Sequence, residues 1–363
     1  MYFIFNGMKK ILFTILFIFF VFMSQAQQRQ IKGPGLHDSL LLKDYTPQSL
    51  FKQAESNPPE KAKYLAIDMH MHAPRNATDA IAHEMLENME KAGIQKTILF
   101  CGIGETFDKN VAVFGKYPDK FELWCWLDLS GSTASTIAEL ERCVQLGAKG
   151  IGELHDKGGG LPENPGMHYD DPRFDPILDK IEELNLPINA HIAEPIWMYE
   201  SMDKNNDLLF EAYYWRLDNK TAWLSHSEVV ASFERALQKH PKITFIAAHF
   251  LNMTYDLNQL GRFFEKYPNL YADVSQREAY VAAIPRFTKK FMEKYADRLL
   301  FGTDQGYSLP MYRNSFRVWQ TNDEHFYAWD VANTRWPMSG IGLSDDALKK
   351  LYRKNALKIL KNR

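Results

Sequence analysis

The first strand-like stretch of the chain reads Tyr64-Leu65-Ala66-Ile67-Asp68-Met69-His70-Met71-His72. It joins a short apolar run to two histidines that are two residues apart. In a β-strand, residues i and i+2 point to the same side, so His70 and His72 can face one point together. Two adjacent imidazoles are a common way to bind a divalent metal. Because a His-x-His pair also occurs on ordinary surfaces, its meaning depends on what the rest of the chain places beside it.

Apolar runs of strand length recur along the chain, and amphipathic helix patterns lie between most of them. The strand-like runs are residues 64–69, 96–101, 123–129, 148–154, 187–191, 243–249, 270–274 and 298–303. The helix-like segments are residues 80–92, 133–146, 172–184, 227–239, 257–267, 286–295 and 344–360. Strands that alternate with helices indicate parallel βαβ units. The pattern predicts an α/β fold, a (β/α)8 TIM barrel, with the last segment as its closing helix.

Residues that can bind metal or carry protons end several of these runs. Glu153, His191, His249 and Asp304 each stand at the end of a run, as the first histidine pair does. A single histidine at a strand end is more often structural than functional. The carboxyl ends of all barrel strands meet at one face, however, and active sites lie there. The recurrence at five strands therefore predicts one shared polar site.

With these motifs the chain resembles the amidohydrolase superfamily. The nearest resemblance is to its amidohydrolase-related branch, which includes the aminocarboxymuconate-semialdehyde decarboxylase-like enzymes. The resemblance covers residues 64–360. The motifs are Ile67-Asp68-Met69-His70-Met71-His72, Ala190-His191, Ala248-His249, Phe301-Gly302-Thr303-Asp304 and the closing Lys354-Asn355-Ala356-Leu357-Lys358-Ile359-Leu360.

The resemblance implies a metal-dependent barrel. It implies that His70, His72, His191 and Asp304 hold the metal. It also implies that His249 contacts the bound water or the substrate, or ligates a second ion. Asp68 shares the parity of the histidine pair and is expected to orient a ligand.

The fourth strand departs from the pattern of two-metal relatives, which often carry a carboxylated lysine or a glutamate there. Lys149 and Glu153 have the same parity, but Lys149 lies four residues earlier, roughly 13 Å at the strand rise. We therefore expect Glu153 to be a metal ligand, with a hydrogen-bonded supporting carboxylate as the alternative. Since the ligand set contains imidazoles and carboxylates without thiolate, the expected cofactor is a divalent metal, Zn²⁺ ahead of Mn²⁺, as one or two ions.

Two functions fit this ligand set. The first is a metal-dependent hydrolase that uses activated water on an ester, lactone or amide of a small molecule, with Asp304 as the proton carrier and His249 steadying the oxyanion. The alternative is a metal-dependent non-oxidative decarboxylase of an aromatic or unsaturated carboxylate. Expected export from the cytoplasm favours hydrolysis. A binding barrel without chemistry is disfavoured by the complete ligand set. Arg75 and Lys157 are candidates to bind an anionic substrate group.

Two segments are too long to be simple connections, and both are rich in aromatic residues. They are residues 194–226, after the fifth strand, and residues 305–343, after the eighth. Both leave the carboxyl ends of strands. We expect most of their aromatic side chains to pack the insertions onto the barrel, and a minority to line a substrate pocket.

The composition limits the class of protein and its partners. The chain has 363 residues, 45% of them hydrophobic and 24% charged, with a formal net charge of −2. These values exclude a disordered, collagen-like or coiled-coil chain. They also argue against a nucleic-acid partner, because there is no basic excess. The expected partner is a small-molecule substrate, and the sequence leaves a homo-oligomer open.

The N-terminal region reads as a targeting segment. Lys9 and Lys10 precede an apolar run over residues 11–23, and Ser24-Gln25-Ala26 resembles a cleavage site. We expect residues 1–26 to be a signal peptide, residues 27–60 a lead-in segment, and residues 61–363 the barrel domain. The mature chain would be periplasmic or secreted, without stable membrane insertion. An uncleaved anchor and a start at Met8 are the alternatives.

Overall fold

The computed structural model describes residues 39–52, 54, 56–331 and 334–361. The predicted signal peptide and its cleavage site lie outside these residues, so both stay predictions. The chain divides into one unit that ends at Tyr45 and a second unit from Thr46 to Arg363. The described part of the first unit holds a 3-10 helix, η2 (Leu42–Asp44). No helix among the described residues is both long and apolar enough to span a bilayer.

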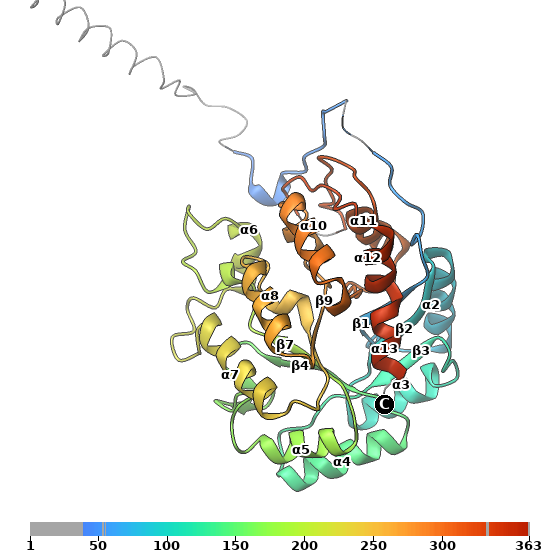
Figure 1. The fold of residues 1–363 in the computed structure, drawn as a ribbon, viewed down its shortest axis with the longest axis vertical. Helices are drawn as coiled ribbons and strands as arrows, with labels where there is room; N and C mark the ends of the chain where they lie inside the picture. Colours follow the sequence, from blue (N-terminus) through green and yellow to red (C-terminus); the bar gives the residue numbers. More distant parts are fainter. Residues whose placement is uncertain (1–38, 53, 55, 332–333, 362–363) are drawn as a thin grey trace, which may run out of the picture. The chain divides into compact units, whose positions relative to one another are not determined.

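Parallel strands form the centre of this unit (Figure 1). One sheet has three strands in the order β1-β2-β3, and the other has five in the order β10-β9-β8-β7-β4. The strands are β1 (Ala66–His72), β2 (Ile94–Phe100), β3 (Phe121–Trp124), β4 (Ile151–Asp156), β7 (Ile188–Ile192), β8 (Phe245–Ala247), β9 (Leu270–Asp273) and β10 (Leu299–Leu300). Each overlaps one of the predicted runs. The short antiparallel pair β5 (Gly160–Leu161) and β6 (Asn164–Pro165) follows β4.

Backbone hydrogen bonds join the two sheets at both edges. Cys125, just after β3, donates to Gly150 O at 3.0 Å, and Gly152 of β4 donates back to Cys125 O at 3.0 Å. At the other edge, Met69 of β1 donates to Phe301 O, just after β10, at 2.9 Å. The strands thus follow one another around a ring, as the predicted (β/α)8 barrel requires.

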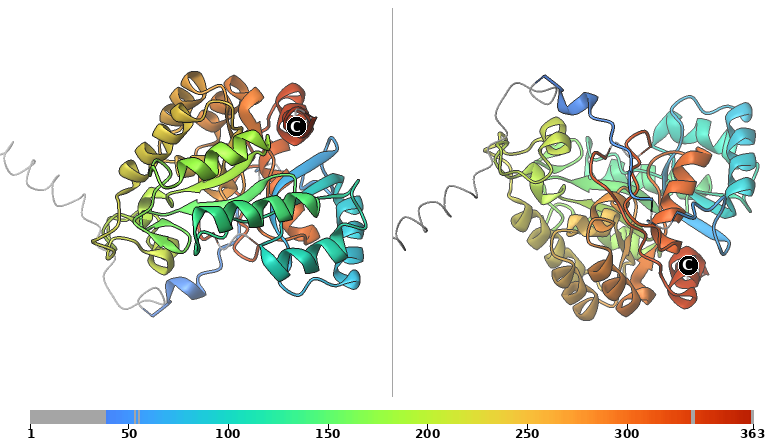
Figure 2. Two further views of the ribbon diagram at one scale, coloured as in Figure 1. Left: turned by 90° about the horizontal axis from the view of Figure 1, so that it is seen from below. Right: turned by 90° about the horizontal axis from the view of Figure 1, so that it is seen from above.

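Helices lie outside the strands in both views of Figure 2. The longer ones are α2 (Asp79–Ala92), α3 (Gly104–Phe114), α4 (Thr133–Gln145), α5 (Asp175–Glu183), α7 (His226–Lys239), α8 (Leu257–Lys266), α10 (Pro285–Lys294), α11 (Leu309–Gln320), α12 (Asp345–Lys349) and α13 (Asn355–Lys361). The shorter ones are η3 (Ile196–Met198), α6 (Leu209–Ala212), η4 (Tyr213–Trp215), η5 (Ala248–Asn252), α9 (Glu278–Val281), η6 (Ala296–Arg298) and the π-helical turn η7 (Lys350–Lys354).

The ends of these helices follow the chemistry of their capping residues. Thr78 accepts a hydrogen bond from the amide of Ile81 at the start of α2, and Gly93 ends that helix in the left-handed conformation at φ 77°. Ser344 accepts from the amide of Ala347 and begins α12, as the sequence predicts.

The two aromatic-rich segments follow β7 and β10, but they are more ordered than a plain insertion. The first contains η3, α6 and η4, and the second begins with α11. Helices α11 and α3 are not among the helices predicted from the sequence. Pro310 near the start of α11 and Gly104 at the start of α3 obscured both helical patterns. Proline is nevertheless tolerated in the first turn, where its missing N–H has no helical partner.

The barrel interior holds a separate apolar cluster. It includes Phe100, Trp124 and Leu300 together with Ile359 of α13, which covers the amino-terminal end of the barrel. Gly152 of β4 and Gly150 just before this strand make room for the large rings. A Cβ on Gly152 would lie 2.5 Å from the ring of Phe100. This packing matters for the site, because the ring of Phe100 lies against both His70, at 4.9 Å between centroids, and His72, at 5.4 Å.

Candidate metal centre

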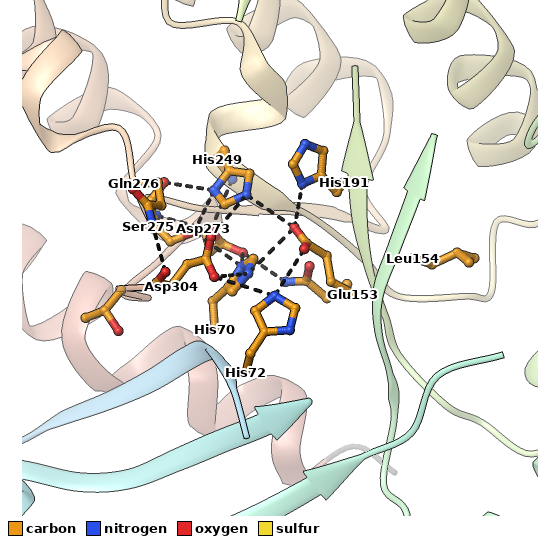
Figure 3. A network of polar contacts seen from close by, with 12 residues as sticks. His70, His72, Glu153, Leu154, His191, His249, Asp273, Ser275, Gln276 and Asp304 are labelled. Atoms are coloured by element: carbon orange, nitrogen blue, oxygen red, sulfur yellow. Dashed lines mark hydrogen bonds and ion pairs between the residues drawn. The ribbon is translucent and has the colours of Figure 1, made fainter. Parts of the chain in front are cut away.

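Six of the predicted site residues converge at the carboxyl ends of the strands (Figure 3). They come from β1, β4, β7, η5 and the turn after β10, and they are His70, His72, Glu153, His191, His249 and Asp304. These strands are parallel, so their carboxyl ends meet on one side of the barrel. The chain therefore brings together residues that are far apart in sequence.

Glu153 lies at the centre of the cluster. Its Oε1 atom is 2.7 Å from His191 Nδ1 and 3.2 Å from His249 Nε2. The same oxygen is 3.6 Å from His70 Nε2, and Oε2 is 3.3 Å from His72 Nε2. One carboxylate thus faces four imidazoles, which is the geometry expected of a group that can share a cation with them.

Asp304 closes the cluster from the opposite side. Its Oδ1 atom is 3.5 Å from His72 Nε2 and 3.6 Å from His70 Nε2, and Oδ2 is 3.8 Å from His249 Nε2. The side chain is 19% exposed, so solvent or a substrate can reach it. Asp304 and His249 both adopt positive φ, 54° and 60°. Such strain in non-glycine residues is typical of functional sites.

Asp273, at the end of β9, holds two of the histidines in place, and the sequence analysis missed it. Its Oδ2 accepts from His70 Nδ1 at 2.9 Å and from Asn189 Nδ2 at 2.9 Å. Its Oδ1 accepts from the backbone amides of His249, at 3.1 Å, and Ser275, at 3.2 Å. Asp273 could have been predicted from the sequence, because it also stands at the end of a strand-like run.

The hydrogen bonds fix which imidazole nitrogens face the cluster. The Nδ1–H group of His70 donates to the Asp273 carboxylate, and that of His249 donates to the carbonyl oxygen of Ser275 at 2.9 Å. Neither acceptor carries a proton to give in return. Each Nε2 atom therefore presents a lone pair toward Glu153 and Asp304, as a metal-ligating histidine does.

The electrostatics of the cluster favour a cation. Burial alone would lower the pKa of His70, yet the carboxylates of Asp273, Asp304 and Glu153 raise it to about 10. Glu153 and Glu194 likewise outweigh burial and raise the pKa of His191 to about 9. The surrounding carboxylates therefore favour positive charge at both histidines, and a divalent ion can supply that charge while the imidazoles stay neutral.

The residues present therefore fit a divalent metal. His70, His72 and Asp304 each offer a ligand atom within 4.8 Å of one another, and so do Glu153, His191 and His249. His70 Nε2 is buried, faces Glu153 and Asp304, and makes no hydrogen bond to any described residue. Buried polar atoms without partners are costly, and a metal ion would satisfy them.

A second charged network lies behind His191, and the sequence analysis did not foresee it. Glu194 Oε1 is 3.4 Å from His191 Nε2 and also pairs with the ammonium group of Lys157. The buried guanidinium of Arg277 is 3.8 Å from Glu194 Oε2 and donates to Asn252 Oδ1 at 2.7 Å and 3.0 Å. Lys157, predicted to bind substrate, is thus already engaged by Glu194.

Two cavities reach the cluster from the side of β2, β3 and β4. One of about 480 Å³ is lined by His72, Arg75 and Phe100, and another of about 380 Å³ by His72, Glu153 and His155. Both are lined by Ile103 and Trp126, and the ring of Trp126 is 6.3 Å from that of His72. Arg75 therefore lies in a cavity that leads to the cluster.

Two residues weighed in the sequence analysis lie outside the cluster. Lys149 is exposed and precedes β4, in agreement with its distance along the strand. Asp68 does not orient an imidazole. Its carboxylate accepts from the backbone amides of His70, at 3.2 Å, and Thr303, at 3.1 Å, and from the Thr303 hydroxyl at 2.7 Å. It fastens β1 to the turn after β10 and so supports the cluster indirectly.

Known proteins resemble this chain in sequence and in fold. The chain is 25% identical over 223 residues to a gamma-resorcylate decarboxylase from a Rhizobium species, and the match covers 52% of this chain and 61% of that protein. It is also 25% identical over 221 residues to the gamma-resorcylate decarboxylase of Rhizobium radiobacter, covering 52% and 60%. The chain thus spans about three fifths of the length of these curated relatives.

The fold resembles solved structures over a longer stretch. The crystal structure of a 2,6-dihydroxybenzoate decarboxylase from Rhizobium superposes with a TM-score of 0.52 and 18% identity, covering 82% of this chain and 99% of that one. At 18% sequence identity, the structural similarity is evidence for a shared fold alone. It confirms the predicted TIM barrel.

The prediction that the protein is a hydrolase is wrong, because both curated relatives are decarboxylases. The physical reason for the error is that metal ligands of this kind serve either reaction. The choice in the sequence analysis depended only on the expected export.

A family-wide comparison covers most of the chain. The family model described as amidohydrolase matches residues 67–361, which include every strand of the barrel except the first residue of β1. Together with the barrel and the clustered histidines and carboxylates, this match shows that the chain belongs to the amidohydrolase family.

Proposed function

We propose that this protein is a metal-dependent, non-oxidative decarboxylase of an aromatic or unsaturated carboxylate. The observation that carries the proposal is the similarity to gamma-resorcylate decarboxylases over 223 residues. Dihydroxybenzoates are therefore the first compounds to consider as substrates. The site is compatible with them, since its cavities combine aromatic walls with one arginine beside the cluster.

We propose His70, His72, Glu153, His191 and Asp304 as the residues that hold the metal. Their nitrogen and oxygen atoms suit Zn²⁺ or Mn²⁺, as one or two ions. The bound metal would supply positive charge that holds the substrate and stabilises negative charge as it develops. Phe100 keeps the first histidine pair in position by packing against both rings.

Asp304 is the proposed proton carrier. In the protonated form it gives its proton to the ring carbon that bears the carboxylate. The carbon–carboxylate bond then breaks, its electron pair returns to the ring, and carbon dioxide leaves. His249 is proposed to assist, because its Nε2 atom is 3.8 Å from Asp304 Oδ2 and presents its lone pair toward that carboxyl group. Solvent can restore the proton, since Asp304 is partly exposed.

Arg75 is proposed to attract the anionic substrate into the cavity beside His72. Trp126 offers a rigid aromatic surface on which a substrate ring can lie, between the two cavities that share it. Direct substrate binding by Lys157 remains a prediction. Lys157 also pairs with Glu194 and so contributes positive charge beside the carboxylate that lies behind His191.

We also propose export of the protein to the periplasm or the medium. The support is the pattern of two lysines, an apolar run and small residues before Gln27. The proposed partner is a small molecule.

The proposed function is tested with purified protein loaded with Zn²⁺ or Mn²⁺ and supplied with 2,6-dihydroxybenzoate. We expect carbon dioxide and 1,3-dihydroxybenzene in equal amounts, and no turnover after the metal is removed by a chelator. Related aromatic and unsaturated carboxylates are tested in parallel. If the metal-loaded protein releases carbon dioxide from none of them, the proposal fails.

A further inference from the structure

A third cavity opens on the same face of the barrel, on the side of β7 to β10. Its volume is about 510 Å³, comparable to a small-molecule site. Four aromatic side chains line it, each from a different loop: Trp197 after β7, Tyr255 after β8, Tyr280 after β9 and Trp336 after β10. Two of them come from the aromatic-rich segments that the sequence analysis singled out.

Three of these rings form a continuous wall. The ring of Tyr280 is 5.1 Å from that of Trp197, and it stacks on that of Trp336 at 6.1 Å with an interplanar angle of 19°. The indole Nε1 of Trp336 donates to the Ala279 carbonyl at 3.1 Å, which fixes the position of this ring. The wall is therefore held in place before any ligand arrives.

Two oxygen-bearing groups accompany the wall. The hydroxyl Oγ1 of Thr254 is buried and makes no hydrogen bond to any described residue. Asp207 contributes an exposed carboxylate. Among the described residues that line this cavity, Asp207 is the only one with a formal charge, and no lysine, arginine or histidine is present.

This cavity is separate from the metal centre. It shares no lining residue with the two cavities that reach His72. The guanidinium of Arg277 is 5.4 Å from the ring of Tyr280 and 3.8 Å from Glu194 Oε2. Since Arg277 is buried and is not among the lining residues, the charged group that faces the cavity itself is Asp207.

We propose that this aromatic cavity is a second binding site, and that it takes an organic cation with an apolar body, of the arylalkylammonium class. The rings attract a cation through their negative faces. The hydroxyl of Thr254 accepts a hydrogen bond from the ammonium group, and Asp207 adds attraction at the rim. A carboxylate ligand would meet Asp207 and find no basic partner. The site thus discriminates against the anionic substrates proposed for the metal centre.

Three probes with similar bodies test the charge preference. They are phenethylammonium, 2-phenylethanol and 3-phenylpropionate, titrated into the full-length protein by calorimetry. We expect phenethylammonium to bind most tightly, the alcohol more weakly and the carboxylate not measurably. Binding of the cation should persist after chelation of the metal. The test therefore stands whether or not the protein is a decarboxylase.

Matched variants locate the site. Trp197→Leu should weaken phenethylammonium binding about tenfold through loss of the cation–π contact. Trp215→Leu, in an exposed tryptophan of the same segment that does not line the cavity, should leave binding unchanged. Asp207→Asn should weaken binding about two- to fivefold. Asp330→Asn is the control for the change in charge, since Asp330 is exposed and does not line the cavity.

Three results would overturn the proposal. They are an absence of binding by the cation, equal binding of the cation and the alcohol, and unchanged binding in Trp197→Leu. Thermal unfolding of each variant checks that it folds. If Trp197→Leu does not fold, Asp207→Asn decides, because an exposed side chain can be replaced without disturbing the core.

Discussion

Asp273 Oδ2 lies 2.9 Å from His70 Nδ1, and this contact sets the direction in which His70 offers its free lone pair. Both oxygens of Asp273 are acceptors only, since Oδ1 receives the amides of His249 and Ser275 while Oδ2 receives His70 and Asn189. An amide in this place cannot satisfy the surrounding donors in either orientation, because one of its two ends is itself a donor.

Asp273→Asn should therefore weaken the metal site. We expect metal affinity to fall about 10- to 100-fold, the usual effect of losing a partner that orients a ligand. Competition with a chelator measures the affinity. Asp297→Asn, an exposed aspartate paired with Lys350, serves as the control. Unchanged affinity in Asp273→Asn would show that the orientation of His70 does not depend on this carboxylate.

The histidine pair gives the most direct test of the cofactor. Metal analysis of the purified protein should find Zn²⁺ or Mn²⁺, and the His70→Ala, His72→Ala double variant should lose it. At a metal concentration 100 times the Kd, bound metal should stabilise the folded protein by about 2.7 kcal/mol. The midpoint of thermal unfolding should rise accordingly in the parent and not in the double variant. His83→Ala, an exposed histidine outside the cluster, should behave like the parent. A parent protein without stoichiometric metal, even after supplementation, would refute the site.

Asp304→Asn separates metal binding from proton transfer. The asparagine keeps the shape and a weak carbonyl ligand but cannot donate a carboxylic proton. Metal should be partly retained, while kcat for decarboxylation falls roughly 10²–10⁴-fold, the usual contribution of a general acid or base. Metal content and steady-state rates are measured on the same preparation. Near-normal kcat would identify His249 as the next candidate for the proton carrier.

Gly152→Ala tests how the barrel interior supports the site. The new Cβ would meet the ring of Phe100 at 2.5 Å and push it toward the two histidines. We expect a loss of about 1–3 kcal/mol in the free energy of unfolding in urea, together with weaker metal binding. Adding Phe100→Leu should restore part of both losses, because it makes room for the methyl group. Equal losses of stability and metal binding in the single and double variants would show that Phe100 does not carry the effect of Gly152→Ala to the metal site.

The expected N-terminus is checked by mass spectrometry of the protein from its native cell envelope. The mature chain should begin at Gln27 or within a few residues of it. Intact chains that begin at Met1 or Met8 and are found in the cytoplasm would contradict export.

The sequence located the strands and the principal cluster because parallel strands end on the same side. His191 and Asp304 can be assigned to the carboxyl-end face of the barrel from their positions at strand ends alone. The roles of Asp273 and Arg277 depend instead on contacts with residues far along the chain, which no local pattern records. The reaction was misjudged for a related reason. Ligands such as His70 suit a metal in either reaction. The choice between the reactions depends on the shape of the cavity walls, which the sequence does not show.

The hydrogen bond from Met69 to Phe301 O joins the first and last strands of the barrel, and His70 and Asp304 lie beside this junction. An ion held by both would cross-link the two ends of the folded chain. Topologically it would resemble a disulfide that closes a very long loop. Metal supply would then govern the lifetime of the protein as well as its activity. When starved of metal, the chain would first open along this junction and expose β1 and β10 to proteases.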